Sequence, residues 1–540
     1  MGKGNIILIG FSYTGKSRGG ERLAQRLGFE FVDLDAQIEK RQGKTISRIF
    51  SEDGEKQFRF LEKELLRKEC KDEGKVLACG GGAILDADNR KLMKESGVVI
   101  LLEASEATIF ERMQEDRRNI RPLLGSGDAL KNVEALKSSR NPYYHALADW
   151  TVHTDSLTPD EVSTEILRGW SYLGRPWERC PITMTTPTRC YPVFVDRGGI
   201  SRLGETMKKI GLQGKAHVIT DDIVFPRYGN RALSSLSDGG FDANFFILPA
   251  GEDTKELGEV SRVYDFLVER KVERKDIIVA LGGGVVGDLA GFVAATLLRG
   301  IPLVQVPTTL LSMVDSAIGG KTGVNHPQAK NLIGSFYQPF LVVADVDTLA
   351  SLGRREFTSG WAEVVKYGMV FDPEFCIFLE REAGNLLELK EEPLIPAIKK
   401  SIEIKAKVVA EDEKEEGRRT LLNYGHTIAH GLEAATTYQR FLHGEAVSIG
   451  MMGGAMISQK MGMLNKDAVE RQKHLLSLFG LPVSFSGVDV EKISEAMELD
   501  KKIRARRIRW VLLYNVGVPV IRDDVPLACV MEVLRELKTG

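Results

Sequence analysis

Two glycine-rich segments, each lying between a short apolar run and a helical stretch, constrain most strongly how this chain can fold. They are Gly10–Ser17 and Gly282–Asp288. A strand, a glycine-rich turn and a helix in this order are typical of α/β units, in which helices cover a parallel sheet. Apolar runs alternate with charged helical stretches around each segment, from residue 5 to about 167 and from 216 to about 346. The sequence therefore predicts two α/β regions.

The length of the chain and the text around these regions predict the domain boundaries. A chain of 540 residues exceeds what one core supports, so more than one domain is expected. Residues 171–189 contain three prolines and no periodicity, which is typical of a linker. We predict a P-loop NTPase-like parallel-sheet domain at 1–170. A Rossmann-like α/β half at 190–350 and an all-helical half at 351–540 should follow, because strand signals almost vanish after about residue 352.

Composition excludes several classes of function. The net charge of −2 argues against a nucleic-acid or membrane-surface partner. No apolar run approaches the length of a bilayer span. The six cysteines are scattered without metal-ligand spacing, which is typical of a reduced cytoplasmic protein. We therefore expect a cytoplasmic protein in which clusters of Lys and Arg bind local anions.

The first glycine-rich segment fits the phosphate-binding pattern G-x-x-x-x-G-K-[ST], with Gly10, Gly15, Lys16 and Ser17 at its fixed positions. Backbone N–H groups in such a loop surround phosphates, the lysine reaches the terminal phosphates, and the hydroxyl holds Mg²⁺. A chance glycine-rich turn is the alternative. The flanking strand and helix argue against it.

Carboxylates and arginines downstream extend this motif. Asp33 and Asp35 end the next apolar run, where one carboxylate can position Mg²⁺ and the other can accept a proton from an attacking hydroxyl. Arg59, Arg121 and Arg140 are separate guanidinium groups, which suit a carboxylate and a travelling phosphoryl group. Taken singly, each of these residues is equally consistent with a solvated surface position.

In this order and spacing, the motifs resemble the shikimate kinase family over about 165 residues. The resemblance implies that ATP binds at Gly10–Ser17 with Mg²⁺ on Ser17 and Asp33, that Arg112 lies near adenine, and that Arg121 is a lid arginine. Lys16, Asp35 and Arg121 are the implied catalytic residues. The residues implied around shikimate are Asp35, Arg59, Gly81, Gly82 and Arg140.

Two positions depart from the family pattern. The family usually has glycine where Tyr13 stands and a second hydroxyl residue where Arg18 stands. If position 13 requires a positive φ, either Tyr13 is strained or the loop is reshaped. The ring could also pack over a nucleotide phosphate. These departures raise the alternative of a nucleotide-binding domain with impaired kinase turnover.

The second glycine-rich segment, Gly282–Asp288, contains G-x-G-x-x-G between a strand and a helix. Glycines at these positions let the backbone approach a pyrophosphate at the helix N-terminus. An ordinary Rossmann unit also has an acidic residue at the end of the next strand, and this chain has none there. The segment predicts a dinucleotide site in a variant fold.

Three of the eight histidines lie within 18 residues, at positions 426, 430 and 443. His426 and His430 are four residues apart, so they share one helix face. Two histidines and a carboxylate make a site with a free position for substrate, which is typical of catalytic zinc. Two ordinary helix histidines are the alternative. The spacing does not select which two histidines bind or which carboxylate completes the site.

Basic residues, several of them flanked by glycine, predict an anion pocket in the same region. They are Arg299, Lys321, Lys330, Lys366, Lys405, Arg419, Lys501 and Lys502. Singly, any of them is equally consistent with a solvated side chain.

The span 190–540 resembles the 3-dehydroquinate synthase family. The segments that carry the resemblance are Gly251–Lys255, Gly282–Asp288, Pro307–Thr309, Asp315–Asn325, Lys330–Phe336, Gly360–Lys366, Asn423–His430, His443–Glu445 and Asp500–Lys502. The resemblance implies Zn²⁺ or Co²⁺ on Glu363, His426 and His443, with His430 beside the substrate. It also implies a homodimer in which Arg299 reaches across the interface.

The same resemblance implies the remaining site residues. Those implied for NAD are Asp221, Glu252, Lys255, Gly283, Gly284, Val285, Asp288, Thr308, Thr309, Lys321 and Lys330. Those implied for the sugar phosphate are Arg299, Asp315, Lys321, Asn331, Lys366, Lys405, Arg419, Asn423, His430, Lys501 and Lys502. The implied catalytic residues are Lys321, Asn331, Lys366 and His430.

Together the two resemblances predict a bifunctional enzyme of the shikimate pathway. The N-terminal part would phosphorylate shikimate at the 3-position with ATP, and the C-terminal part would convert 3-deoxy-arabino-heptulosonate 7-phosphate to 3-dehydroquinate and phosphate. The alternatives are an active synthase with an impaired nucleotide-binding domain, another sugar-phosphate cyclase or a glycerol-dehydrogenase relative, and another small-molecule kinase. Lys321, Asn331 and His430 as a set favour the synthase over plain alcohol dehydrogenases.

Overall fold

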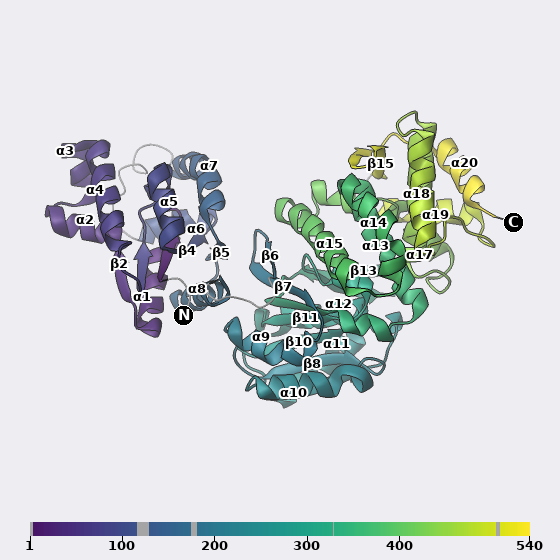
Figure 1. Cartoon of the computed structure of the whole chain (residues 1–540), viewed down its shortest axis with the longest axis horizontal. Helices are drawn as coiled ribbons and strands as arrows, with labels where there is room; N and C mark the ends of the chain where they lie inside the picture. The colour runs from purple at the N-terminus through teal and green to yellow at the C-terminus, as the bar shows by residue number, and fades with distance from the viewer. Residues whose placement is uncertain (1–3, 116–128, 174–180, 328, 504–507, 540) are drawn as a thin grey trace. The chain divides into compact units, whose positions relative to one another are not determined.

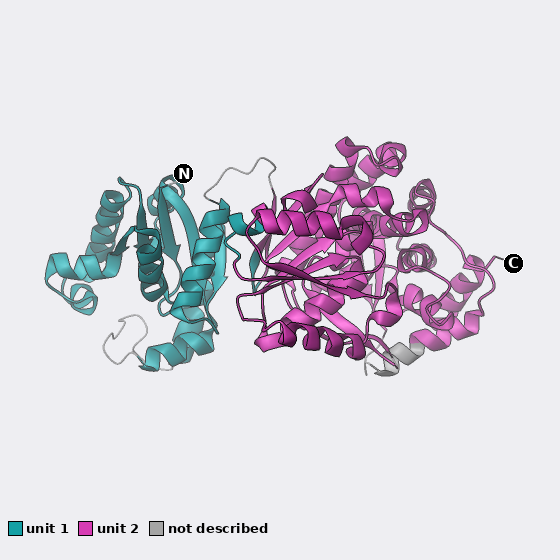
Figure 2. Cartoon of the chain, turned by 90° about the horizontal axis from the view of Figure 1, so that it is seen from below, with its two compact units in different colours: residues 1–178, 187–190, 206–212 teal, residues 179–186, 191–205, 213–540 magenta. Residues whose placement is uncertain are grey.

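The computed structural model describes residues 4–115, 129–173, 181–327, 329–503 and 508–539, apart from the side chains of 129 and 498–503. The chain divides into two compact units, coloured teal and magenta in Figure 2. Residues 1–178, 187–190 and 206–212 form the first unit, and residues 179–186, 191–205 and 213–540 form the second.

A parallel five-stranded sheet, in the order β2-β3-β1-β4-β5, lies at the centre of the first unit (Figure 1). Its strands are β1 Asn5–Ile9, β2 Glu30–Asp33, β3 Lys75–Ala78, β4 Gly97–Glu103 and β5 Trp150–His153. The helices around it are α1 Lys16–Leu27, α2 Leu34–Gln42, α3 Ile46–Glu52, α4 Gly54–Glu69, η1 Ala83–Leu85, α5 Ala87–Ser96, α6 Glu106–Glu115, α7 Ala129–Leu147 and α8 Pro159–Leu173.

The central strands of this sheet are apolar because helices cover both faces. Every residue of β1 is buried, and Ile7 pairs with Leu77 of β3 and Val99 of β4. Since the strands run parallel, their carboxyl ends share one edge of the sheet. The loops that follow β1, β2 and β3 therefore meet at that edge, where the predicted phosphate loop lies.

A second sheet has the order β6-β7-β14-β11-β10-β8-β9, and neighbours from β7 to β9 are parallel. Its strands are β6 Ile182–Thr185, β7 Cys190–Asp196, β8 Ala216–Asp221, β9 Ala243–Leu248, β10 Ile277–Gly282, β11 Leu303–Pro307 and β14 Leu341–Asp345. The helical segments of this region are η2 Ile200–Arg202, α9 Leu203–Lys209, η3 Phe225–Gly229, α10 Asn230–Asp238, η4 Glu252–Thr254, α11 Leu257–Glu269, α12 Gly284–Thr296, η5 Leu297–Arg299, η6 Ser312–Ser316 and η7 Val346–Ser351. An antiparallel hairpin is formed by β12 Lys321–His326 and β13 Ala329–Phe336.

Helices dominate the rest of the chain, as predicted. They are α13 Arg354–Phe371, α14 Pro373–Leu387, α15 Glu391–Glu411, η8 Arg418–Asn423, α16 His426–Ala435, α17 His443–Lys460, α18 Lys466–Leu478, α19 Val490–Ile503 and α20 Leu527–Leu537. The most central helix, α17, is buried along most of its length and packs against α13, α16, α18 and α20.

Three strands were not expected where they occur. The prediction of an all-helical half is wrong in one place, because β15 Trp510–Asn515 and β16 Val518–Arg522 form an antiparallel hairpin. In β15, Trp510 and the three residues after it are buried. Gly517, with φ 80°, lies in the turn between the two strands. The strand β6 lies within the segment 171–189 and buries Met184 at the sheet edge. Among the helices of the described ranges, none has both the length and the apolar character needed to cross a membrane.

Candidate functional sites

The phosphate loop follows β1 and ends at Gly15, which caps α1 in the left-handed region with φ 95°. Lys16 Nζ donates to the carbonyls of Gly10 and Phe11 at 2.9 and 2.7 Å, so the side chain folds back over the loop. Ser17 Oγ donates to Asp33 Oδ2 at 2.5 Å. A hydroxyl and a carboxylate therefore lie together at the start of the helix, where Mg²⁺ bound to a nucleotide would be held.

Tyr13 is strained, which is one of the two outcomes expected from the sequence at this position. Its φ is 66°, a region that bulky L-residues rarely adopt, at a cost of about 1–2 kcal/mol. The loop does not adopt another conformation that would relieve this backbone strain. The carbonyl of Tyr13 accepts a hydrogen bond from Arg112 Nη1 at 3.1 Å, so the side chain predicted near adenine is attached to the phosphate loop.

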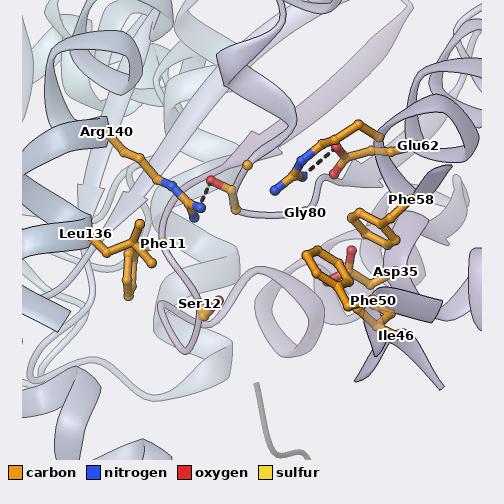
Figure 3. Close-up of a pocket in the computed structure, with 13 residues that line it drawn as sticks. Phe11, Ser12, Asp35, Ile46, Phe50, Phe58, Glu62, Gly80, Leu136 and Arg140 are labelled. Atoms are coloured by element: carbon orange, nitrogen blue, oxygen red, sulfur yellow. Dashed lines mark hydrogen bonds and ion pairs between the residues drawn. The ribbon is translucent and has the colours of Figure 1, made fainter. Parts of the chain in front are cut away.

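A pocket lies beside this loop, lined by residues of the loop itself, of helices α2 to α4, of the loop after β3 and of α7. Figure 3 shows Phe11, Leu136 and Arg140 on one wall and Asp35, Phe50 and Phe58 on the opposite wall. The structure brings all five residues predicted around shikimate to this pocket, namely Asp35, Arg59, Gly81, Gly82 and Arg140. Arginines and a carboxylate between aromatic walls suit a small hydroxylated carboxylic acid.

Glu62 is a pocket residue that the sequence analysis missed. It accepts a hydrogen bond from Arg59 Nη1 at 2.8 Å, and its side chain is almost completely buried. Burial raises the pKa of Glu62 to about 7, although Arg59 opposes the shift. The three-residue spacing from Arg59 on helix α4 was the available signal. Glu62 holds the guanidinium group that faces the pocket.

One backbone position, the carbonyl of Gly81, completes this site. Arg140 Nη1 and the Tyr144 hydroxyl both donate to the carbonyl of Gly81, at 3.1 and 2.5 Å. Helix α7 thereby holds the loop after β3 against the pocket. Arg121 lies outside the described residues.

In the second unit, Glu363, His426 and His443 converge, and one ligand atom from each lies within 4.8 Å of the others. Glu363 comes from α13, His426 from the first residue of α16 and His443 from the first residue of α17. Both imidazoles present Nε2 toward Glu363 Oε1, at 3.6 and 3.8 Å. His430 is exposed and is not part of this cluster, although its ring centroid lies 5.6 Å from that of His426.

The contacts of the two histidines and of Glu363 fit a divalent metal. His426 Nδ1 faces the Tyr424 carbonyl at 3.3 Å, and burial together with Lys366 holds the pKa of His426 well below its usual value. His443 Nδ1 lies 3.2 Å from Glu433 Oε1. Partners on Nδ1 leave both Nε2 lone pairs available, as is typical of metal-binding histidines. The Glu363 carboxylate is fully buried, with Oε1 facing the two imidazoles and Oε2 paired with Lys366.

Buried cations surround this cluster. Lys366, one turn after Glu363 on α13, forms an ion pair with it. Lys405 Nζ donates to Asp315 Oδ1 at 2.7 Å, and the Tyr367 hydroxyl donates to the same oxygen at 2.9 Å. Burial alone would raise the pKa of Asp315, but Lys405 and Lys366 lower it well below its usual range. Two buried lysines therefore lie in this region, Lys366 paired with Glu363 of the cluster and Lys405 paired with Asp315.

The predicted dinucleotide site lies at the carboxyl ends of β10 and β11. Helix α12 begins after Gly283, and a Cβ atom on that glycine would lie 3.2 Å from Thr309 Cγ2. A helix N-terminus with such close backbone packing suits a pyrophosphate. Lys255 Nζ donates to Asp288 Oδ2 and Asn331 Oδ1, both at 2.5 Å.

The hairpin β12–β13 contributes to the edge of this site. Asn331 adopts φ 54°, and its N–H donates to Asn325 Oδ1 at 2.9 Å. Asn331 was implied for the sugar phosphate, but here it contacts Lys255, which was implied for NAD. Lys330 Nζ lies 4.4 Å from the ring centroid of Tyr438 and 3.7 Å from Glu252 Oε1. Tyr438 belongs to the loop before His443, so this contact joins the hairpin to the helical half.

Glu415 is a second residue that the sequence analysis missed. Its carboxylate accepts from Lys321 Nζ at 2.5 Å and from Asn423 Nδ2 at 2.7 Å. Its backbone is left-handed with φ 61°. Asp412 shapes the same loop by accepting from the N–H groups of Glu416, Gly417 and Arg419. No local spacing signals Glu415, because its partners come from distant segments.

The remaining predicted residues lie near these elements or outside the described part. Arg419 is buried and donates to the carbonyls of Glu413 and Gly319 at 2.5 and 3.0 Å. Arg299 is exposed at φ 67° and has no hydrogen bond or ion pair to the other predicted substrate residues that are described. Asp221 ends β8 and accepts from the N–H of Val224 at 2.8 Å. The side chains of Lys501 and Lys502 lie outside the described residues.

Sequence models of three families match the chain. Shikimate kinase matches residues 13–170, 3-dehydroquinate synthase N-terminal matches 245–359, and 3-dehydroquinate synthase C-terminal matches 360–503. The 3-dehydroquinate synthase of Nostoc punctiforme is 46% identical over 359 residues, which are 66% of this chain and 98% of that protein. That of Caldanaerobacter subterraneus is 44% identical over 341 residues, 62% of this chain and 96% of its own.

Two solved structures are similar to the second unit. A 2-deoxy-scyllo-inosose synthase, complexed with carbaglucose-6-phosphate, NAD⁺ and Co²⁺, has a TM-score of 0.61 and 26% identity over 66% of this chain and 100% of that chain. The 2-epi-5-epi-valiolone synthase of Streptomyces hygroscopicus, with NAD⁺ and Zn²⁺ bound, has a TM-score of 0.60 and 26% identity over 67% of this chain and 99% of that chain.

Proposed function

The chain belongs to the 3-dehydroquinate synthase family and carries a shikimate kinase domain before it, and from this premise we propose a bifunctional enzyme that uses ATP to phosphorylate shikimate and converts 3-deoxy-arabino-heptulosonate 7-phosphate to 3-dehydroquinate. The convergence of Glu363, His426 and His443 beside paired buried lysines carries the second activity. The pocket beside the phosphate loop carries the first.

In the kinase, Asp35 is proposed to accept the proton of the attacking shikimate hydroxyl. Arg59 and Arg140 flank the same pocket and suit the substrate carboxylate, which guanidinium groups bind with two parallel hydrogen bonds. Lys16 would exchange its contacts with loop carbonyls for the terminal phosphates of ATP. Ser17 and Asp33 would hold Mg²⁺.

The synthase site fits a divalent metal and a dinucleotide. Glu363, His426 and His443 would hold Zn²⁺ or Co²⁺, and the start of α12 with Lys255 and Asp288 would hold NAD. When bound, these groups would polarise a substrate hydroxyl and provide a reversible hydride acceptor. Glu363 Oε1, which faces both imidazoles, and the neutral His426 would supply ligand atoms of the kind that such a metal requires.

The protein's own residues would orient the sugar phosphate. Lys366, Lys405 and Arg419 are buried cations around the metal cluster, so they suit an anionic substrate shielded from water. Lys321 and Asn423 would exchange Glu415 for substrate oxygens. His430, exposed beside His426, is placed to move a proton at the substrate.

Several finer points belong to the same proposal. The domain boundaries would be 1–170, 171–189, 190–350 and 351–540. The enzyme would be a cytoplasmic homodimer through its C-terminal part, with Arg299 of one subunit completing the phosphate region of the other. The cyclase alternative is less favoured, because the curated dehydroquinate synthases are 44–46% identical, whereas the two solved cyclases are 26% identical.

Both activities of the full chain test the proposal. ATP-dependent phosphorylation of shikimate is measured beside phosphate release from the heptulosonate phosphate with NAD⁺ and Zn²⁺. Asp35→Asn should lower kinase turnover roughly 10²- to 10⁴-fold and leave phosphate release unchanged. Glu363→Gln should do the reverse and reduce the bound metal. A wild-type chain that releases phosphate but does not phosphorylate shikimate would reduce the N-terminal part to a nucleotide-binding domain.

A further inference from the structure

We propose that Tyr13 is a positioning residue of the kinase, which attaches the phosphate loop to the helix pair α6–α7. The inference rests on the proposed kinase function and adds to it a residue that the family pattern does not supply. Its evidence comes from the backbone of Tyr13, from the partners of its carbonyl and from the surroundings of its ring.

The backbone of Tyr13 is unfavourable in isolation. Its φ of 66° lies in the left-handed region, which is uncommon for a bulky residue. Such a conformation persists only when surrounding contacts hold it, and these outliers cluster where a loop must present its backbone to a ligand. Gly10 and Gly15, at φ 142° and 95°, adopt positive φ without this penalty. Position 13 therefore needs an additional stabilising contact that the glycine positions do not need.

Two hydrogen bonds hold the backbone at this point. Arg112 Nη1 donates to the Tyr13 carbonyl at 3.1 Å, and Arg112 Nη2 donates to the Thr154 carbonyl at 2.5 Å. The Thr154 hydroxyl in turn donates to the Thr14 carbonyl at 3.1 Å. The two consecutive carbonyls of the loop are therefore fixed by α6 and by the residue after β5.

The ring provides the third attachment. Tyr13 packs against an apolar cluster that includes Phe11 from the loop, Ile109 from α6 and Val133 from α7, all at most 3% exposed. Leu136 of α7 packs against the same cluster. Phe11 and Leu136 also line the pocket for the acceptor substrate, on the wall that Figure 3 shows beside Arg140. The ring thus links the phosphate loop to a wall of the neighbouring pocket.

This arrangement has a definite kinetic consequence. Phosphate binding depends on the fixed direction of several loop N–H groups, which a loop without the ring would not maintain. Removing the ring should therefore weaken nucleotide binding first. Because Leu136 and Arg140 lie on the same helix, shikimate binding should weaken by a smaller factor.

Three substitutions separate the ring from the backbone strain. Tyr13→Phe keeps the ring, Tyr13→Gly removes both the ring and the strain, and Tyr13→Ala removes the ring and keeps the strain. In the full chain, KM for MgATP should stay within about twofold of wild type for Phe, rise about 5- to 20-fold for Gly, and rise further for Ala. The turnover number should change less than KM. Tyr143→Ala, at a 42% exposed tyrosine on α7, is the matched control and should change neither.

Synthase activity of the same chains reports that the protein is folded, and calorimetric titration with MgADP separates the inference from the proposed function. If wild type binds MgADP but does not phosphorylate shikimate, weaker MgADP binding by the Gly variant still supports the positioning role. A Gly variant that binds MgADP as tightly as wild type, or has an equal or lower KM for MgATP, overturns it. In that case Tyr13 is only a tolerated replacement for glycine.

Discussion

The kinase pocket and the synthase site both present cations to a small anionic substrate, but they keep those cations in different ways. In the kinase pocket, Arg59 has a side chain 26% exposed and pairs with two carboxylates, Glu55 and Glu62, and Arg140 donates to a backbone carbonyl. In the synthase site, the side chains of Lys366 and Lys405 are at most 5% exposed; Lys366 is paired with the fully buried Glu363, and Lys405 with Asp315, which is 30% exposed. Arg59 should therefore be replaceable at a lower cost in stability than Lys366 or Lys405, whose ammonium groups are part of the core.

The largest expected effect tests the buried pair. Asp315→Asn leaves the Lys405 ammonium without a counter-charge, so the free energy of unfolding of the second unit should fall by about 3–5 kcal/mol. Calorimetry of the full chain measures it, with the surviving activity after heating assigning each transition. The double variant Asp315→Leu/Lys405→Met should recover most of the stability but no synthase activity. A single variant as stable as wild type would contradict the difference between the two sites.

The corresponding change in the kinase pocket should act on binding alone. Arg59→Lys removes the planar guanidinium group that can form bidentate hydrogen bonds with a carboxylate, so KM for shikimate should rise roughly 10- to 100-fold. Because Arg59 is partly exposed, the free energy of unfolding should change by less than about 1 kcal/mol. Steady-state kinetics and urea unfolding of the same protein measure both. A large loss of stability here would remove the contrast between the sites.

A smaller effect concerns pH in the kinase pocket. The Glu62 carboxyl gains a proton as the pH falls through its pKa of about 7, and its bond with Arg59 then loses its charge assistance. KM for shikimate should rise about fivefold between pH 8 and pH 6, since a charge-assisted hydrogen bond exceeds a neutral one by about 1 kcal/mol. Glu62→Gln should show the higher value at both pH values. An identical slope in the variant would assign the titration to another group.

The smallest effect tests the contact between the hairpin and the helical half. Tyr438→Ala removes the ring below Lys330, so the apparent affinity for NAD should fall about two- to fivefold. Tyr438→Phe retains the ring and should behave as wild type. Fluorescence titration with NADH measures both variants. Equal affinities for the Ala and Phe variants would show that the contact does not support the dinucleotide site.

Local patterns were enough to predict the parallel sheets and the phosphate loop, because a strand, a glycine turn and a helix are adjacent in the sequence. The carboxylates that hold other functional groups were missed. Glu433, which supports His443, lies seven residues after His426 on the same helix, so helical spacing offered a signal. Glu415 offered none, since Lys321 and Asn423 reach it through the tertiary fold. The hairpin β15–β16 was missed because helices surround it in the sequence.

The position of Glu415 has a consequence for selectivity. Lys321 and Asn423 already share a carboxylate attached to the same chain, so any anion that binds them competes with a resident group. The net binding free energy of such an anion is the difference between its own interaction with Lys321 and Asn423 and the similar interaction of Glu415 that it replaces. A small inorganic anion, which offers only one contact, gains little from the exchange. A larger molecule also places oxygens against the surrounding lysines and so makes additional contacts. The site is therefore expected to select ligands by their size and number of contacts, and not by charge alone.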